Sequence, residues 1–286
     1  MVFDDDDIFL GRYSSKNFSE FYSEYKIFIE KINSAPLETK KHFMLADGTY
    51  NFKKLAIIFN NDRKENGNIL FKKLSKAKDI VVNLWLCKVQ NKAKIFEMIN
   101  IPPFQGLSEE KAREIIQLNY TEKSYLSIPS ILINEGIILI YEESFPGLNL
   151  DGAVYKNHNG NPVISLSIRH NRLDNFWFTL SHELAHVILH HNQMDEVILD
   201  DLDDSEEYTQ GREFEANKLA GDMLIPRRIW RSCPVKYTRS SHDIESFSEE
   251  VNIHPAIIAG RIRKERGNYT LFNDVIYKED LRKELF

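Results

Sequence analysis

The sequence predicts an α+β fold that is mostly helical, with a small antiparallel or mixed sheet packed on one buried helix. From about Phe18 to Phe96, apolar residues recur at helical spacing. Short β-prone runs follow between residues 136 and 168. Residues 174–191 then carry apolar side chains all round the helical cylinder, which is typical of a buried helix. With 42% hydrophobic and 28% charged residues, the 286-residue chain can bury a substantial core.

Residues 1–107 form the predicted helical N-terminal region, which ends where two prolines and a glycine interrupt the pattern at residues 101–106. Within it, the stretch Lys53–Lys94 has 11 basic residues against three acidic ones. This stretch could contact nucleic acid or an acidic partner, although solvation of the polar faces of amphipathic helices is sufficient to account for the lysines. The whole chain has a net charge of -6, so its overall charge gives no argument for nucleic-acid binding.

Residues 108–235 are the predicted central domain. Ser108 precedes two glutamates and is expected to cap a helix that runs to about Leu118, and a second helix should end near Asn134. Three strands are expected after these helices, and the Gly-containing turn between the last two suits a hairpin. The predicted strands lie at 136–141, 153–156 and 163–168, and the predicted turn lies at 157–161.

The predicted buried helix contains the pattern H-E-x-x-H at His182, Glu183 and His186. Two imidazoles four residues apart lie on one helix face, about 6 Å apart along the axis, and can reach the same metal ion. Two buried histidines without a partner would be costly, so this pattern predicts metal binding rather than a chance core pair. Glu183 adjoins the first ligand and is the predicted catalytic base. His190 and His191 are expected at the helix end, where a positive charge suits the helix dipole.

A catalytic zinc site normally has three protein ligands, so a third must come from another segment. The downstream helix EFEANKLAGDMLIP offers Glu213 and Glu215. Glu213 shares a stripe with small residues such as Ala216 and Ala220, which would let this helix approach the first one closely, whereas Glu215 lies on a more polar face. We therefore predict Glu213 as the third ligand, with Glu215 as the alternative. For a donor that stabilises the oxyanion, His170 and Tyr208 are nearby in sequence, and neither is assigned.

The segment between these helices is strongly acidic, with eight Asp or Glu among the 13 residues from Asp195 to Glu207. It is expected to be a solvated loop or, if it lies near the cleft, to favour basic substrates. Cys87 and Cys233 are far apart, so neither a disulfide framework nor a thiolate zinc site is expected. The chain opens with four aspartates and contains no long apolar run, so a cytoplasmic protein is expected.

The two segments FTLSHELAHVILHH and EFEANKLAGDMLIP resemble the ImmA/IrrE-type zinc metallo-endopeptidases, and the resemblance extends over about Ser108 to Ile262. It implies a zincin-like core with zinc as cofactor, and alignment on Pro226 places the family's ligand glutamate on Glu213. Residues 236–286 match the family's helix-turn-helix-like tail, with Pro255 in the first turn of its second helix. Such tails pack on the catalytic domain, so packing is expected for this tail as well.

The resemblance implies cleavage of a protein substrate, namely a regulatory DNA-binding repressor or an antitoxin. The alternative is a non-proteolytic regulatory or antitoxin-like module that keeps the same fold and binds DNA or a protein partner. The basic stretch Lys53–Lys94 and the tail favour this alternative, whereas an intact Glu183 beside an open metal site argues against it. A membrane partner is not expected.

Overall fold

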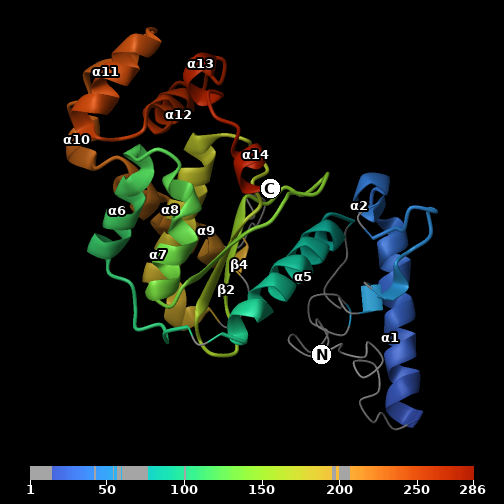
Figure 1. The fold of residues 1–286 in the computed structure, drawn as a ribbon. Helices are drawn as coiled ribbons and strands as arrows, with labels where there is room; N and C mark the ends of the chain where they lie inside the picture. The colour runs from blue at the N-terminus through green and yellow to red at the C-terminus, as the bar shows by residue number, and fades with distance from the viewer. Residues whose placement is uncertain are drawn as a thin grey trace. The chain divides into compact units, whose positions relative to one another are not determined.

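The computed structural model describes residues 15–41, 43–53, 55–56, 59, 77–99, 101–194, 198–199 and 207–286. Helices dominate, and a small mixed sheet accompanies them, which confirms the α+β class (Figure 1). Residues 54, 57–58 and 60–76 of the basic stretch Lys53–Lys94 lie outside the described residues, as does most of the acidic connection Asp195–Glu207. The chain divides into two compact units.

The first unit comprises Met1–Lys88 and Phe145–Leu148. Its described helices are α1 (Ser15–Ser34), α2 (Leu37–Lys41) and the first part of α5 (Ala77–Glu97). Aromatic rings form much of its interior: Phe28 and Phe59 have ring centroids 5.4 Å apart, and Phe43 meets Phe145 edge to face at 6.0 Å. Such pairs add to the stability gained from burying the rings. The predicted helical character of this region is confirmed for the described residues.

The second unit comprises Val89–Ser144 and Asn149–Phe286. Ser108 caps α6 as predicted, because its Oγ accepts a hydrogen bond from the backbone N–H of Lys111 at 3.1 Å. The prolines before α6 separate it from α5. The helices of this unit are α6 (Glu109–Gln117), α7 (Ile128–Asn134), α8 (Leu173–His190), α9 (Glu207–Leu224), α10 (Arg227–Arg231), α11 (Ser241–Val251), α12 (Pro255–Arg266), α13 (Asn273–Ile276) and α14 (Leu281–Leu285).

In the described part of the chain, the sheet has four strands in the order β1-β3-β2-β4. β1 (Ile138–Tyr141) runs parallel to β3 (Pro162–Leu166), whereas β2 (Gly152–Lys156) is antiparallel to both of its neighbours. The predicted hairpin between β2 and β3 is confirmed, and Gly160 supplies the positive φ of 82° that its turn requires. The fourth strand corrects the prediction of a loop, because β4 (Ile198–Leu199) pairs with β2 inside the acidic connection.

Helix α8 is the centre of the second unit. It contacts β2 and β3 of the sheet and also α6, α9 and α12. Trp177, Leu180 and Leu184 are fully buried on it, which confirms the predicted buried helix. Its N-cap position is Arg172, which makes no side-chain cap, and Asp174 lies in the first turn, with Oδ1 3.1 Å from the Nε of Arg172.

The tail packs on α8 through α12, as expected. Pro255 occupies the first turn of α12, and the helix buries Ile257, Ile258 and Ile262. Lys264 and Glu265 on the same helix are exposed. The division of the chain at residues 107 and 235 stays a prediction. Among the described helices, none combines the length and the hydrophobicity needed to cross a membrane.

Candidate metal centre

Three side chains from α8 and α9 converge in the second unit: His182, His186 and Glu213, which we call the His-His-Glu cluster. The two Nε2 atoms lie 2.9 Å apart. The Nε2 of His182 is 3.1 Å from Oε2 of Glu213, and the Nε2 of His186 is 3.2 Å from Oε1 of the same carboxylate. Both histidines are 1% exposed. The structure thus brings together the three residues that the sequence predicts as ligands.

The local sequence explains this convergence. The spacing of four residues puts both imidazoles on the same face of α8. On α9, Ala216 and Ala220 are fully buried, and these small side chains let α9 lie close to α8, with which it makes extensive contact. Glu213 is one turn before Ala216 on this face, whereas Glu215 is exposed and lines a different surface pocket. Their different environments follow from the two helix faces on which they lie.

The environment of the cluster favours a neutral imidazole at His186 and an ionised carboxylate at Glu213. Burial lowers the pKa of His186, although the hydrogen bond to Glu213 acts in the opposite direction. Burial also raises the pKa of Glu213, but hydrogen bonds from His182 and His186 outweigh this effect and lower its pKa to about 2. Neutral imidazole and ionised carboxylate are the forms that bind a metal ion.

The donor set fits a divalent cation. Ligand atoms about 2.0–2.2 Å from a tetrahedral zinc ion are about 3.3 Å from one another, close to the 2.9–3.2 Å separations in the cluster. Two imidazoles and one carboxylate are also a ligand set found in catalytic zinc sites. Within the described residues, the buried Nδ1 of His186 has no hydrogen-bond partner. The polar contacts of this imidazole are those of its Nε2 atom, which faces His182 and Glu213.

Glu183 lies at the contact between α8 and the sheet and is 1% exposed. Gly152, the first residue of β2, approaches it so closely that an added Cβ would collide with Oε1 of Glu183 and lie 2.8 Å from Cγ2 of Thr179. The missing side chain at position 152 is thus what makes room for the glutamate. Gly152 carries no signal in the sequence, because glycines next to strands are common in ordinary turns.

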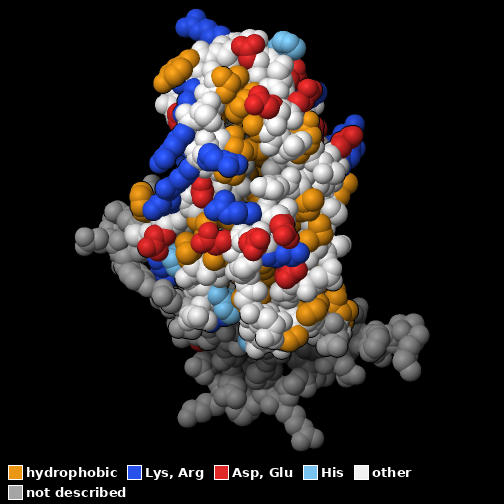
Figure 2. Space-filling view, turned by 90° about the vertical axis from the view of Figure 1, so that its left-hand side faces the viewer, with side chains coloured by type: hydrophobic (Ala, Val, Ile, Leu, Met, Phe, Trp, Pro, Cys, Tyr) orange, Lys and Arg blue, Asp and Glu red, His pale blue; other side chains and the backbone are white. Residues whose placement is uncertain are grey.

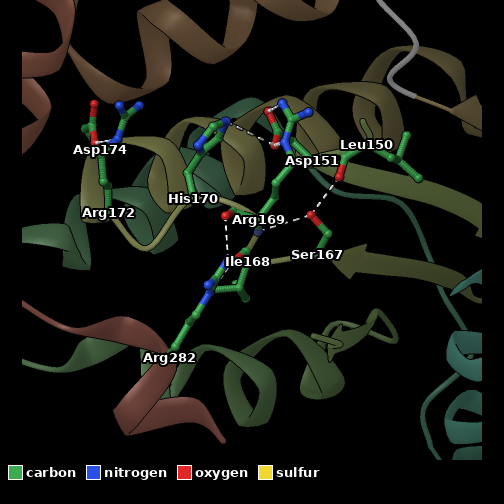
Figure 3. Close-up of polar contacts among 9 residues, drawn as sticks. All are labelled: Leu150, Asp151, Ser167, Ile168, Arg169, His170, Arg172, Asp174 and Arg282. Atoms are coloured by element: carbon green, nitrogen blue, oxygen red, sulfur yellow. Dashed lines mark hydrogen bonds and ion pairs between the residues drawn. The ribbon is translucent and has the colours of Figure 1, made fainter. Parts of the chain in front are cut away.

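The loop between β3 and α8 is held in an unusual conformation. Ile168 has a φ of 46°, a left-handed value that costs a β-branched residue about 1–3 kcal/mol. Figure 3 shows what surrounds it: Ser167 donates its hydroxyl hydrogen to the carbonyl of Leu150 at 2.6 Å. From α14, Arg282 donates to the carbonyls of Ile168 and Arg169 at 3.1 and 2.6 Å. These contacts fix the segment that leads into α8.

An ion pair joins this loop to the residue that precedes Gly152. Arg169 binds Asp151 through two hydrogen bonds of 2.9 and 3.2 Å, and both side chains are partly buried. His170 lies beside the pair, with Nε2 4.0 Å from Oδ1 of Asp151 (Figure 3). Burial lowers the pKa of His170, although Asp151 favours its protonated form. The sequence gives no signal for this pair, because its partners belong to different segments.

Two further histidines follow the cluster on α8. His190 is the last residue of the helix, which confirms its predicted place at the helix end, and its side chain is 4% exposed. His191 lies 3.2 Å from the carbonyl of Gly160, and its ring packs against that of Phe104. The side chain of Tyr208 lies outside the described residues, so its expected proximity to the site is untested.

The His-His-Glu cluster could hold a metal ion, and comparison with family models shows what this part of the chain is similar to. Residues 134–263 match the peptidase model described as the IrrE N-terminal-like domain. This match confirms the resemblance to the ImmA/IrrE type and implies a metallopeptidase-type function. The match includes the His-His-Glu cluster and Glu183. A comparison with curated proteins finds no match to the chain.

The close approach of Gly152 to Glu183 can be tested with Gly152→Ala. The added methyl group must displace the glutamate, and such overpacking costs about 1–3 kcal/mol of unfolding free energy. Gly211→Ala in α9 is the control, because an added Cβ there meets nothing within 4 Å. Urea denaturation monitored by circular dichroism measures both. Equal stability of the two variants would contradict the proposed contact.

Proposed function

We propose that this chain is a zinc-dependent metallo-endopeptidase with a zincin-like core, which cleaves a DNA-binding repressor or an antitoxin. The observation that carries the proposal is the convergence of two imidazole nitrogens and one carboxylate within about 3 Å, next to a buried glutamate. The family supports a peptidase, and the cluster supports a metal ion. Zinc is the ion that this mixture of imidazole and carboxylate ligands suits best.

In this proposal, His182 and His186 hold the zinc ion through Nε2, and Glu213 holds it through its carboxylate. When bound, zinc supplies Lewis-acid chemistry: it polarises a peptide carbonyl and makes water a stronger acid. The low pKa of Glu213 keeps its carboxylate charged at neutral pH, so two neutral ligands and one anion face the cation.

Glu183 is the proposed general base. Its carboxylate takes a proton from the attacking water and then donates that proton to the departing amine nitrogen. Its position supports this role. Glu183 follows His182 directly on α8, and its side chain is packed against Gly152 of β2. The loop contacts of Arg169 and Arg282 fix the entry to α8 and so help to orient the helix that carries the base.

The proposed substrate class follows from charge and from the family. Eight of the 13 residues from Asp195 to Glu207 are acidic, and this segment connects the two helices that carry the cluster. An acidic segment at the edge of the active site would attract basic proteins, and DNA-binding repressors are often basic. Within this segment, Ile198 and Leu199 form β4, which pairs with β2.

Metal binding is tested first by the metal content of protein purified without added metal. We expect about one zinc ion per chain, and at least tenfold less in His186→Ala and in Glu213→Gln, since each removes one of three ligands. His242→Ala and Glu215→Gln are matched controls at exposed positions. Equal zinc content in His186→Ala and in the unaltered protein would exclude the cluster as the site.

The catalytic role is tested with Glu183→Gln, which keeps the shape of the side chain and removes the base. Zinc content should be retained, while cleavage of a proteome-derived peptide mixture, followed by mass spectrometry, should fall by about 10²–10⁴-fold. Glu249→Gln on the surface of α11 should cleave as the unaltered protein does. Unchanged cleavage by Glu183→Gln would remove this residue from the mechanism.

One surface favours the alternative of a non-proteolytic binding module. Residues 227–239 contain five basic and no acidic residues, and the arginines among them are exposed. Figure 2 turns the face that carries α10 towards the viewer and shows Lys and Arg side chains gathered beside a band of Asp and Glu. If this alternative holds, Glu183→Gln protein will bind duplex DNA with an affinity that falls steeply with salt, and the unaltered protein will cleave nothing.

A further inference from the structure

A pocket lies near the His-His-Glu cluster and is lined by residues of both helices that carry the cluster. It is a pocket of about 580 Å³ between α8, α9 and α12, within the size range of ligand sites and larger than one side chain needs. Its walls combine apolar, amide and cationic side chains. The lining includes Phe178, Asn217, Gly221, Leu224, Ile257 and Lys264.

The pocket adjoins the cluster through both ligand helices. The ring of Phe178 stacks on the imidazole of His182, with centroids 6.2 Å apart and ring planes at 28°. On α9, Asn217 is one helical turn after Glu213 and therefore on the same face. One wall of the pocket is thus formed by the residues next to two of the proposed ligands. A polypeptide bound at the cluster would have this pocket within reach of the residues next to its scissile bond.

Among the described residues that line the pocket, one cation has no ion pair. Arg172 pairs with Asp174 at 3.1 Å, and Arg261 pairs with Glu265 at 3.2 Å. Lys264 has no ion pair within the described residues, and its Nζ lies 4.9 Å from the ring centroid of Phe178. The side chain of Lys264 is exposed, so an incoming anion can reach it without displacing a protein partner.

We propose that this pocket binds a short segment of the protein substrate beside the scissile bond and selects an acidic side chain through Lys264. Phe178, Leu224 and Ile257 contact the apolar part of that segment, and the carboxylate lies at the Nζ of Lys264. This inference rests on the proposed peptidase function and adds a specificity determinant to it. An acidic residue near the cleavage site is compatible with a basic substrate protein, because the pocket contacts only a few residues.

Two glycines define the shape of the pocket. Gly221 on α9 lines it, and an added Cβ there would meet nothing within 4 Å, so a larger side chain at this position would extend into open space. Gly260 on α12 is different, because an added Cβ would lie 2.5 Å from Oδ2 of Asp174. The wall between α8 and α12 is therefore tightly packed, whereas the α9 side can be filled without disturbing the core.

The experiment uses two variants and a matched control for each. Lys264→Glu reverses the charge in the pocket, and Lys278→Glu makes the same change at an exposed position outside it. Gly221→Leu fills the pocket, and Gly211→Leu adds the same side chain to open space in the same helix. Leucine has a higher helix propensity than glycine, so neither leucine variant should destabilise α9. All four are also made in the Glu183→Gln protein.

The first readout is equilibrium binding. Immobilised Glu183→Gln protein selects peptides from a proteome-derived mixture, and bound peptides are identified by mass spectrometry. We expect about fivefold enrichment of glutamate over glutamine at one position, the size expected for a single exposed ion pair. Lys264→Glu should reverse the preference towards lysine, and Gly221→Leu should reduce peptide retention at least tenfold. The two controls should bind as their parent does.

The second readout is the cleavage profile of the proteins with an intact Glu183. An acidic preference that disappears in Lys264→Glu, with the controls unaltered, supports the pocket. Cleavage without an acidic preference, or peptide retention unchanged by Gly221→Leu, overturns it. Absence of cleavage by the unaltered protein counts against the peptidase function alone, because the binding readout still decides whether the pocket selects acidic peptides.

Discussion

The contact between α8 and α9 is the constraint on which the rest of the site depends. It places two buried imidazoles and a carboxylate within about 3 Å of one another, a grouping that would be costly without a shared proton or cation. Ala216 and Ala220 make the close approach of the helices sterically feasible. The pocket beside Phe178 depends on the same helices, since α8 packs against both α9 and α12 and residues of all three helices line the pocket.

A second constraint comes from the sheet. Glu183 occupies the space that Gly152 leaves open, and Asp151 next to this glycine holds Arg169 of the loop before α8. The start of β2 thus contacts the proposed base and the loop that introduces its helix. The strained backbone of Ile168 is tolerated because hydrogen bonds from both sides fix its neighbours. Catalytic geometry would therefore depend on the sheet as much as on the metal ligands.

The predictable features are those encoded within one segment. The helical spacing of His182 and His186, the cap at Ser108 and the hairpin around Gly160 follow from local patterns, and the structure agrees with them. The choice of Glu213 required a comparison of helix faces. Strand β4 was missed because the apolar run Val197–Leu199 is short and has acidic residues on both sides, and pairing of Ile198 and Leu199 with β2 determines the conformation of the strand. The ion pair of Asp151 and the pocket depend on tertiary packing, which no local pattern encodes.

The hydrogen bonds of Arg282 have a consequence for biosynthesis. This residue lies 114 positions after Ile168, whose carbonyl accepts one of its hydrogen bonds. During translation, α8 and α9 emerge from the ribosome well before α14, so the loop in front of α8 lacks this support while most of the second unit is already present. The final fixation of that loop therefore waits for the synthesis of α14, and a nascent chain that still lacks this helix carries a looser entry to α8.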